Sequence, residues 1–164
     1  MAYANGIFRS PGETLPRFPT TTHSKSGQNG LKPYNSANAA LDRIPLDAAN
    51  HDIGFARRTG RTAPWDGSGL ATCITCGSSV KGHPTECRRF TMRELATLQT
   101  YTFNHVFEGS ITSQCRQIGN SVPPHFAKLL QRENIRHMKM CDAKTNVADG
   151  DVDDSVGGNV VVID

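Results

Sequence analysis

The segment Gly119–Pro124 places a glycine, two short polar side chains and the start of a helix within six residues. Glycine permits a tight turn and lets a ligand approach the backbone, while the free amides at a helix start carry partial positive charge. Such a junction could bind a small polar ligand. Because glycine and proline also mark ordinary loops, these residue types leave both interpretations open.

A second group could bind a metal ion. Cys73-x2-Cys76-x6-His83-x3-Cys87 offers four soft ligands within fifteen residues, a spacing that loosely resembles a zinc knuckle. However, if Leu70–Ser78 is a strand, Cys73 and Cys76 point to opposite faces of it. We therefore predict no metal site, and a zinc-dependent nucleic-acid module remains an alternative.

The basic residues are unevenly distributed. From Cys141 onward the chain contains six Asp and one Lys, a net charge of −5. Because the whole chain has a net charge of +3, the first 140 residues carry +8. A basic body suits contact with phosphates, and Arg57, Arg58 and Arg61 gather around Gly60 in a loop-like stretch. A solvated surface would explain the same arginines equally well.

Several elements must position these groups. The segment Ser36–Ile44 predicts a short helix capped by Ser36, and Leu70–Ser78 predicts a strand because it is rich in β-branched and small residues. In Thr91-x-x-Glu94 we identify a capping box that opens a helix from Met92 to about Gln99, burying Leu95 and Leu98.

Prolines mark both ends of the chain's ordered part. Three prolines within nine positions make the segment before His23 an extended strap, because proline fixes φ and lacks an amide donor. At the other end Pro123-Pro124 predicts a second helix start, with Phe126, Leu129 and Leu130 facing inward. The Gly- and Asp-rich tail is predicted to be disordered.

Two of these stretches, taken in order, resemble a known family. R-R-F-T-M-R-E-L-A-T-L-Q (residues 88–99) and Q-I-G-N-S-V-P-P (residues 117–124) resemble the last two motifs of the DNA cytosine-5 methyltransferases. The strap at residues 10–23 resembles the segment after the family's eighth motif. Trp65-Asp66-Gly67, T-C-I-T and His83-Pro84 resemble the end of its target-recognition region.

The resemblance implies an α/β fold and a division of the chain. We expect a fragment of a methyltransferase fold: residues 1–23 are a strand end and proline strap of the catalytic domain, and residues 24–87 are an irregular, β-containing target-recognition region. Residues 88–140 are C-terminal helices that return to the catalytic domain, and residues 141–164 are a disordered acidic tail.

The resemblance also implies the activity, transfer of methyl from S-adenosylmethionine to C5 of cytosine in DNA. The family's nucleophile lies in a Pro-Cys-Gln loop, its acid in Glu-Asn-Val and its cofactor loop in Phe-x-Gly-x-Gly, and this sequence contains none of them. Covalent catalysis needs an activated nucleophile, so we predict no catalytic residue here and no activity of the chain alone. The alternative function is that of a non-enzymatic DNA-binding or regulatory remnant. We expect the chain to originate as a truncated gene product.

Site residues carried over from the family fall into two sets. Asn120, Ser121 and Val122 are expected to contact S-adenosylmethionine, as half of a pocket that a missing N-terminal catalytic half would complete. Double-stranded DNA is the expected partner, through a set of arginines and threonines: Arg57, Arg58, Arg61, Thr72, Thr75, Arg89 and Arg93. Because the family's penultimate-motif helix mainly supports the recognition region, a structural role for Arg89 and Arg93 is the alternative. The family implies a nuclear location in a eukaryote and a cytoplasmic one otherwise.

The cysteine count and the hydropathy exclude other classes. Five cysteines are an odd number and no signal-peptide pattern precedes them, so a secreted disulfide framework is not expected. No run approaches the ~18 apolar residues that a membrane span requires.

Overall fold

A computed structural model describes residues 15–76 and 82–148, with side chains described as far as residue 143. The chain divides into two compact units, one formed by residues 19–130 and one by residues 1–18 and 131–164. The larger unit holds every element except most of the last helix. The expected strand end before residue 15 and the acidic tail after residue 148 lie outside the described residues.

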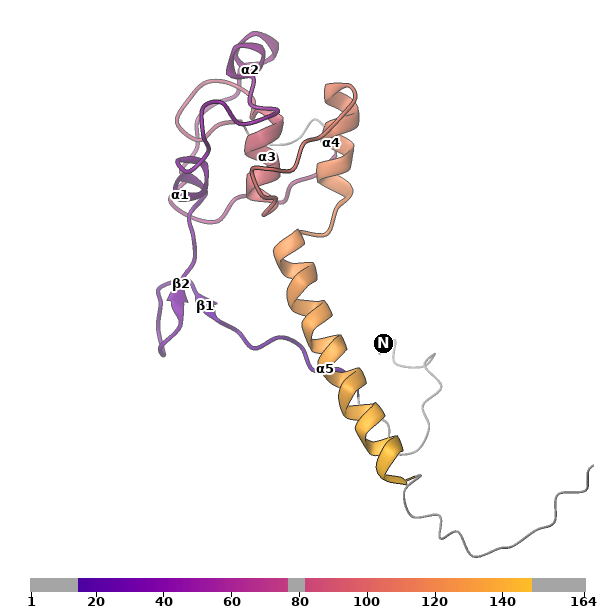
Figure 1. Ribbon diagram of the computed structural model, residues 1–164. Helices are drawn as coiled ribbons and strands as arrows, with labels where there is room; N and C mark the ends of the chain where they lie inside the picture. The colour runs from indigo at the N-terminus through magenta and orange to yellow at the C-terminus, as the bar shows by residue number, and fades with distance from the viewer. Residues whose placement is uncertain (1–14, 77–81, 149–164) are drawn as a thin grey trace, which may run out of the picture. The chain divides into compact units, whose positions relative to one another are not determined.

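Among the described residues, the larger unit contains four whole helices: α1 (Ala37–Leu41), α2 (Ile53–Thr59), α3 (Met92–Leu98) and α4 (Ile111–Asn120). In Figure 1, α3 lies between α1 and α4, and it contacts both. Two strands, β1 (His23–Ser24) and β2 (Lys32–Pro33), pair in parallel. The described residues therefore form a helical body with one small parallel sheet, which is compatible with part of a methyltransferase fold.

The helix starts follow from the sequence. Ser36 accepts a hydrogen bond from the Ala39 amide and caps α1, and Thr91 caps α3 with the reciprocal Glu94 bond of a capping box. The last helix, α5 (Pro124–Ala148), begins at a proline, where no amide partner is needed. These three helix starts are confirmed.

Two helices were missed. Helix α2 occupies part of the stretch interpreted as loop, and Asp52 caps it by accepting from the Phe55 amide. Ser110 caps α4 by accepting from the Ser113 amide. Both caps are residue types that favour helix starts, so this signal was present in the sequence.

The strand predicted for Leu70–Ser78 is wrong over Leu70–Cys76, which is irregular, and its last residues lie outside the described residues. Ile74 packs against the core, and the backbone at Thr75 and Cys76 lies against α4. The segment is therefore held by packing rather than by pairing with a neighbouring strand, and β-propensity reports packing as much as backbone preference.

The core of the larger unit lies around α3. Six buried side chains form it, and partly buried ones such as Trp65, Ile74 and Tyr101 pack onto it. The buried members come from α1, α3, α4 and the loops beside them: Leu41, Phe90, Leu95, Ala96, Phe107 and Ile118. Burial of Leu95 was predicted and is confirmed.

Helix α5 differs from the prediction at both ends. Phe126 is 48% exposed rather than buried. The disordered tail was predicted to begin at Cys141, but α5 continues to Ala148. No glycine or proline interrupts the chain between Pro124 and Gly150, so nothing in the sequence stops the helix earlier.

Candidate functional site

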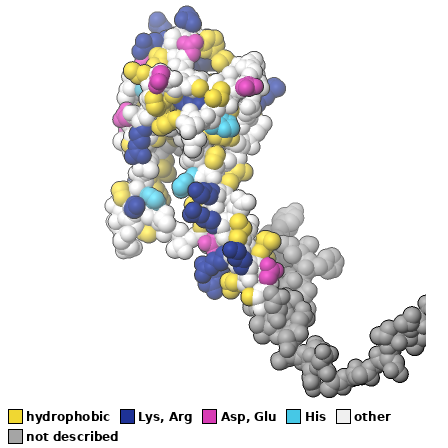
Figure 2. Space-filling model, viewed as in Figure 1, with side chains coloured by type: hydrophobic (Ala, Val, Ile, Leu, Met, Phe, Trp, Pro, Cys, Tyr) yellow, Lys and Arg dark blue, Asp and Glu magenta, His cyan; other side chains and the backbone are white. Residues whose placement is uncertain are grey.

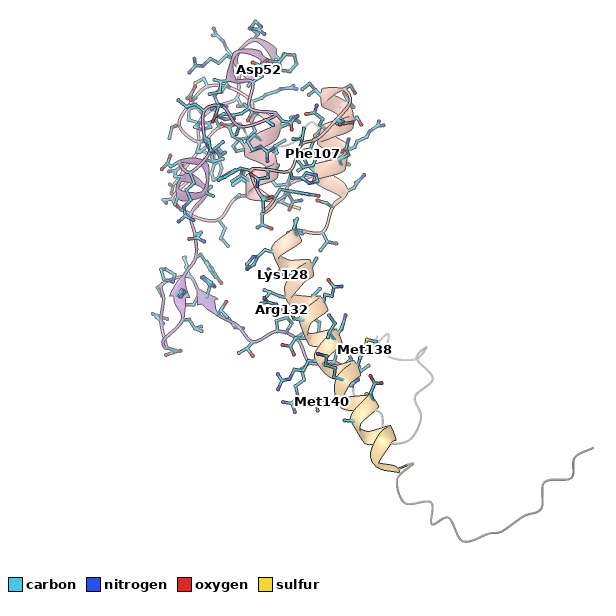
Figure 3. All side chains as sticks on the ribbon, in the orientation of Figure 1. Asp52, Phe107, Lys128, Arg132, Met138 and Met140 are labelled. Carbon is cyan, nitrogen blue, oxygen red and sulfur yellow. The ribbon has the colours of Figure 1, made fainter. Side chains whose placement is uncertain are left out.

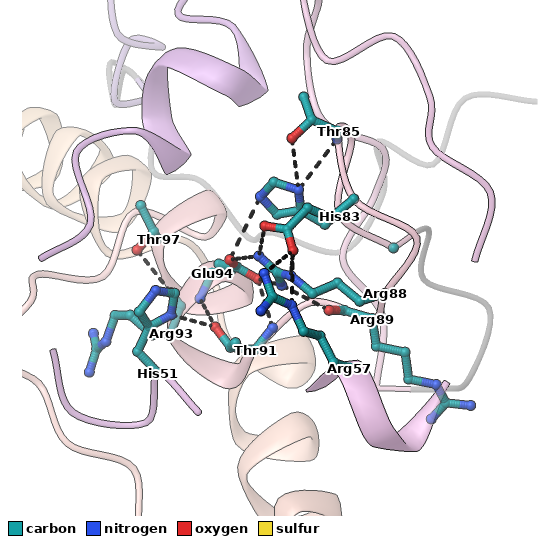
Figure 4. A network of polar contacts seen from close by, with 12 residues as sticks. His51, Arg57, His83, Thr85, Arg88, Arg89, Thr91, Arg93, Glu94 and Thr97 are labelled. Carbon is teal, nitrogen blue, oxygen red and sulfur yellow. Dashed lines mark hydrogen bonds and ion pairs between the residues drawn. The ribbon is translucent and has the colours of Figure 1, made fainter. Parts of the chain in front are cut away.

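A buried ion pair anchors the start of α3 (Figure 4). Both carboxylate oxygens of Glu94 accept from the Arg88 guanidinium at 2.8 Å, and one of them also accepts from the Thr91 amide at 2.8 Å. Arg88 and Glu94 are each only 2% exposed. Bidentate, charge-assisted hydrogen bonds of this kind are the geometry that can offset the desolvation cost of a buried pair.

A second carboxylate extends the network to the surface. Glu86 accepts from Arg88 at 3.0 Å and from Arg57 at 2.8 Å. Hydrogen bonds from Arg88 and then Arg57 lower the pKa of Glu86 to about 2. Burial acts to lower the pKa of Arg88, but the bonds to Glu94 and Glu86 outweigh it and raise that pKa. Arg57, predicted to contact DNA, is thus partly neutralised by Glu86.

Two histidines border this network. His83 lies 3.8 Å from Glu94, and its Nδ1 lies 3.2 Å from the Thr85 hydroxyl. The ring of His51 bonds the Thr91 hydroxyl at 2.9 Å. Burial lowers the pKa of both histidines. Among the residues with described positions, no three His, Cys, Asp or Glu side chains gather as metal ligands.

Arg93 requires a correction. It was placed in the DNA-contacting set, but its side chain is fully buried and donates to the carbonyls of Ala49, Thr102 and His105. Its side chain ties two loops to α3 and is not exposed at the surface, where a phosphate contact would form. Burial without a carboxylate partner lowers the pKa of Arg93.

The exposed arginines come together at the end of α2. Arg58 lies in the last turn of α2, and Gly60 is the residue directly after the helix. A Cβ on Gly60 would lie 2.5 Å from Nε of Arg89, so the Arg89 side chain crosses the backbone at this glycine. This contact places Arg89 beside the stretch that carries Arg58 and Arg61, and all three are exposed. Sequence reasoning found these cations but not the crossing that joins them.

The two threonines of the predicted set lie elsewhere. Thr72 and Thr75 are exposed in the irregular 70–76 segment, and Thr72 lines a cavity of about 1030 Å³. Arg58, Arg61 and Arg89 do not line that cavity. The structure therefore groups the arginines with each other and not with the threonines.

The segment predicted to be a glycine turn is the end of a helix. Gly119 and Asn120 are the last residues of α4, and Ser121 caps it. A Cβ on Gly119 would lie 2.4 Å from the Cys76 amide nitrogen, so this glycine is needed for close packing rather than for turning.

The large cavity includes part of the predicted cofactor set. Gly119, Ser121 and Pro123 line it, whereas Asn120 and Val122 do not. The Ser121 hydroxyl donates to the Ile118 carbonyl at 2.7 Å, which leaves its lone pairs as acceptors. Val122 is 58% exposed on the surface.

A residue that sequence reasoning missed lies on the same cavity wall. Thr100 has a left-handed backbone (φ 67°) and its hydroxyl accepts from the His125 amide in the first turn of α5 at 3.1 Å. This hydrogen bond holds the cavity wall beside Ser121 in place and gives a partner to one of the otherwise unpaired amides at the start of α5. In the sequence, Thr100 is marked merely by its position directly after Gln99, the last residue of the first motif.

None of the helices in residues 15–76 and 82–148 combines the length and the apolar composition that a membrane crossing requires.

Parts of this chain are similar in sequence to known methyltransferases. The chain is 33% identical over 141 residues to the type II methyltransferase M.NgoFVII of Neisseria gonorrhoeae, covering 66% of this chain and 38% of that protein. It is 47% identical over 51 residues to DNA (cytosine-5)-methyltransferase 1B of Oryza sativa subsp. japonica, covering 31% and 3%. DNA (cytosine-5)-methyltransferase 3 of Arabidopsis thaliana is 36% identical over 93 residues, covering 54% and 6%.

The chain thus spans well under half the length of these relatives. The family profile for C-5 cytosine-specific DNA methylases matches residues 16–136, which include the Arg88–Glu94 network and the α4–α5 junction. This chain belongs to the C-5 cytosine-specific DNA methylase family.

Proposed function

We propose that this chain supplies the target-recognition region and the closing motifs of a DNA cytosine-5 methyltransferase, the enzyme class that moves methyl from S-adenosylmethionine to C5 of cytosine. The observation that carries the proposal is the family match over residues 16–136. Within that match, a cluster of exposed arginines and a cavity wall at the end of α4 provide surfaces suited to DNA and to a cofactor.

The sequence lacks the motifs that carry out catalysis in the family. The sequence holds no Pro-Cys-Gln, Glu-Asn-Val or Phe-x-Gly-x-Gly motif, and none of its five cysteines follows a proline. Without a nucleophile and its helper, covalent attack on cytosine has no starting group. We therefore propose that the chain transfers no methyl group alone and acts as a fragment that a catalytic half completes. The predicted boundaries at residues 23, 87 and 140 are part of this proposal.

The residues at the α4–α5 junction fit part of S-adenosylmethionine. The cofactor carries hydroxyl, amino and carboxylate groups, and its sulfonium centre supplies the methyl group when it is bound. Ser121 offers hydroxyl lone pairs on the cavity wall, and Asn120 offers an exposed amide one residue away. Val122 offers an exposed apolar contact. These three residues are proposed as half of the cofactor site.

Arg58, Arg61 and Arg89 are the proposed phosphate contacts. They are exposed, and the Gly60 crossing groups them at the end of α2. Arg57 contributes less because Glu86 pairs with it. Thr72 and Thr75, exposed on a separate segment, are proposed as contacts to bases or sugars. Phosphate contacts position a protein on the duplex without reading its sequence, so the preferred bases depend on this second set. A nuclear location in a eukaryote, or a cytoplasmic one otherwise, follows from the DNA substrate.

Binding of the full chain to duplex DNA over a range of salt concentrations tests this proposal. The Arg58→Gln/Arg89→Gln variant should bind more weakly, with the slope of log K against log salt reduced by about 2, since each phosphate contact contributes about 1. The matched control is Lys25→Gln/Lys32→Gln, which removes two exposed charges outside the proposed contacts. Absence of duplex binding by the wild-type chain, or equal slopes for the two variants, would contradict the assignment.

A further inference from the structure

Helix α5 carries a row of cations on one face. In its part beyond residue 130, Arg132, Arg136 and Lys139 are spaced by four and three residues, the spacing that places helical side chains above one another. With a rise of 1.5 Å per residue, the row is about 10 Å long. All three residues are exposed, Arg136 with 74% of its side chain. Figure 2 shows Lys and Arg side chains gathered along α5, and Figure 3 marks Arg132 on it.

The acidic residues nearby neutralise the row only in part. Glu133 lies 4.0 Å from Arg136, at the limit of an ion pair between exposed groups. Such pairs contribute little, because water and salt screen them. Asp142 follows Lys139 by one turn, but among the side chains of residues 15–76 and 82–143 neither Arg132 nor Lys139 forms an ion pair. In the sequence, Lys128 precedes Arg132 by four residues and continues the spacing.

No role described so far uses these cations. They belong neither to the Arg88–Glu94 network nor to the lining of the large cavity, and the proposed function assigns phosphate contacts to the arginines at the end of α2 instead. A merely solvated helix face tends to alternate the signs of its charges. This face instead keeps three like charges in a row, which repel each other unless an anion lies opposite them.

We propose that the Arg132–Arg136–Lys139 face of α5 binds the phosphate backbone of duplex DNA. The inference rests on the proposed function, which brings this polyanion to the protein. Duplex DNA carries about one charge per 1.7 Å of its axis, so a 10 Å row of cations faces several phosphates at once. Long, flexible side chains reach phosphates without reading bases, and this face therefore adds affinity rather than sequence preference.

The test compares three full-length variants on one random-sequence 30-base-pair duplex. Arg132→Gln/Lys139→Gln removes two charges from the face and leaves Arg136 with Glu133. Arg58→Gln/Arg89→Gln tests the α2 arginines, and Lys25→Gln/Lys32→Gln is the control. Glutamine preserves helix propensity, so α5 should stay folded, and the circular dichroism at 222 nm verifies it. The α5 variant should lower the salt slope by about 2, and the control should leave it unchanged.

The outcomes separate the two proposals. An α5 variant that binds like the control, while the α2 variant binds more weakly, would overturn the α5 face and leave the proposed function intact. A wild-type chain that binds no duplex would overturn both. Vesicles containing anionic phospholipid provide a further arm: loss of vesicle binding in the α5 variant with unchanged DNA binding would overturn DNA as the occupant of this face.

Discussion

Substituting Glu94 by Ala tests whether the buried pair with Arg88 holds the start of α3. The change removes both 2.8 Å bonds to the guanidinium and the capping bond to the Thr91 amide. Removing one partner of a buried pair leaves an uncompensated charge, which costs about 3–5 kcal/mol of unfolding free energy. Because Glu86 still contacts Arg88 from the partly exposed side, we expect the lower part of that range, about 3–4 kcal/mol.

The assay is urea unfolding of the full chain followed by circular dichroism. The control is Glu133→Ala, which removes the same group from an exposed pair 4.0 Å long and should cost no more than about 0.5 kcal/mol. Glu94→Gln should fall between the two, because the amide oxygen can still accept from Arg88 or Thr91. If Glu94→Ala and Glu133→Ala differ by less than about 1 kcal/mol, the pair does not anchor the helix as described.

The structure also fixes the direction of a pH effect and of two glycine substitutions. Burial lowers the pKa of His51 and His83 below 6.5, so the unfolded chain takes up protons first as pH falls. The stabilising contribution of the neutral histidines should be fully present above pH 6.5, and the unfolding free energy should decrease below that pH. In urea titrations at several pH values, His51→Gln/His83→Gln should reduce this decrease. Gly119→Ala should destabilise by about 1–3 kcal/mol, because the new Cβ meets backbone at 2.4 Å. Gly54→Ala in α2 meets only side-chain atoms at 3.3 Å, so thermal melts should show it neutral or stabilising.

Local signals predicted the helix starts well. Ser36, Thr91 with Glu94, and Pro124 act through contacts within four residues of each cap, so the sequence alone specifies them. The same reasoning, applied to Asp52 and Ser110, would have found α2 and α4. Gly54 within α2 and Gly109 before α4 weaken the helical pattern of those stretches, because glycine favours turns and loops.

Long-range packing determined the features that were not predictable. Arginine is seldom fully buried, so nothing in the sequence around Arg93 indicates that it bonds carbonyls nine to forty-four residues away. The helical role of Gly119 depends on the 70–76 segment, more than forty residues earlier. For the candidate site, the motifs indicated Ser121 and the exposed arginines, but only the fold shows which of them share a cavity wall or a surface.

Methyl transfer by a reconstituted pair tests the central claim most directly. The chain would be mixed with a separately expressed polypeptide that carries the family's Pro-Cys-Gln, Glu-Asn-Val and Phe-x-Gly-x-Gly motifs, with labelled S-adenosylmethionine and duplex DNA. Asn120→Ala is the site variant and Lys25→Gln the control. We expect label in cytosine from the pair but from neither part alone, and a higher KM for S-adenosylmethionine with Asn120→Ala. Methylation by this chain alone, or none by a pair whose parts bind each other, would contradict the account.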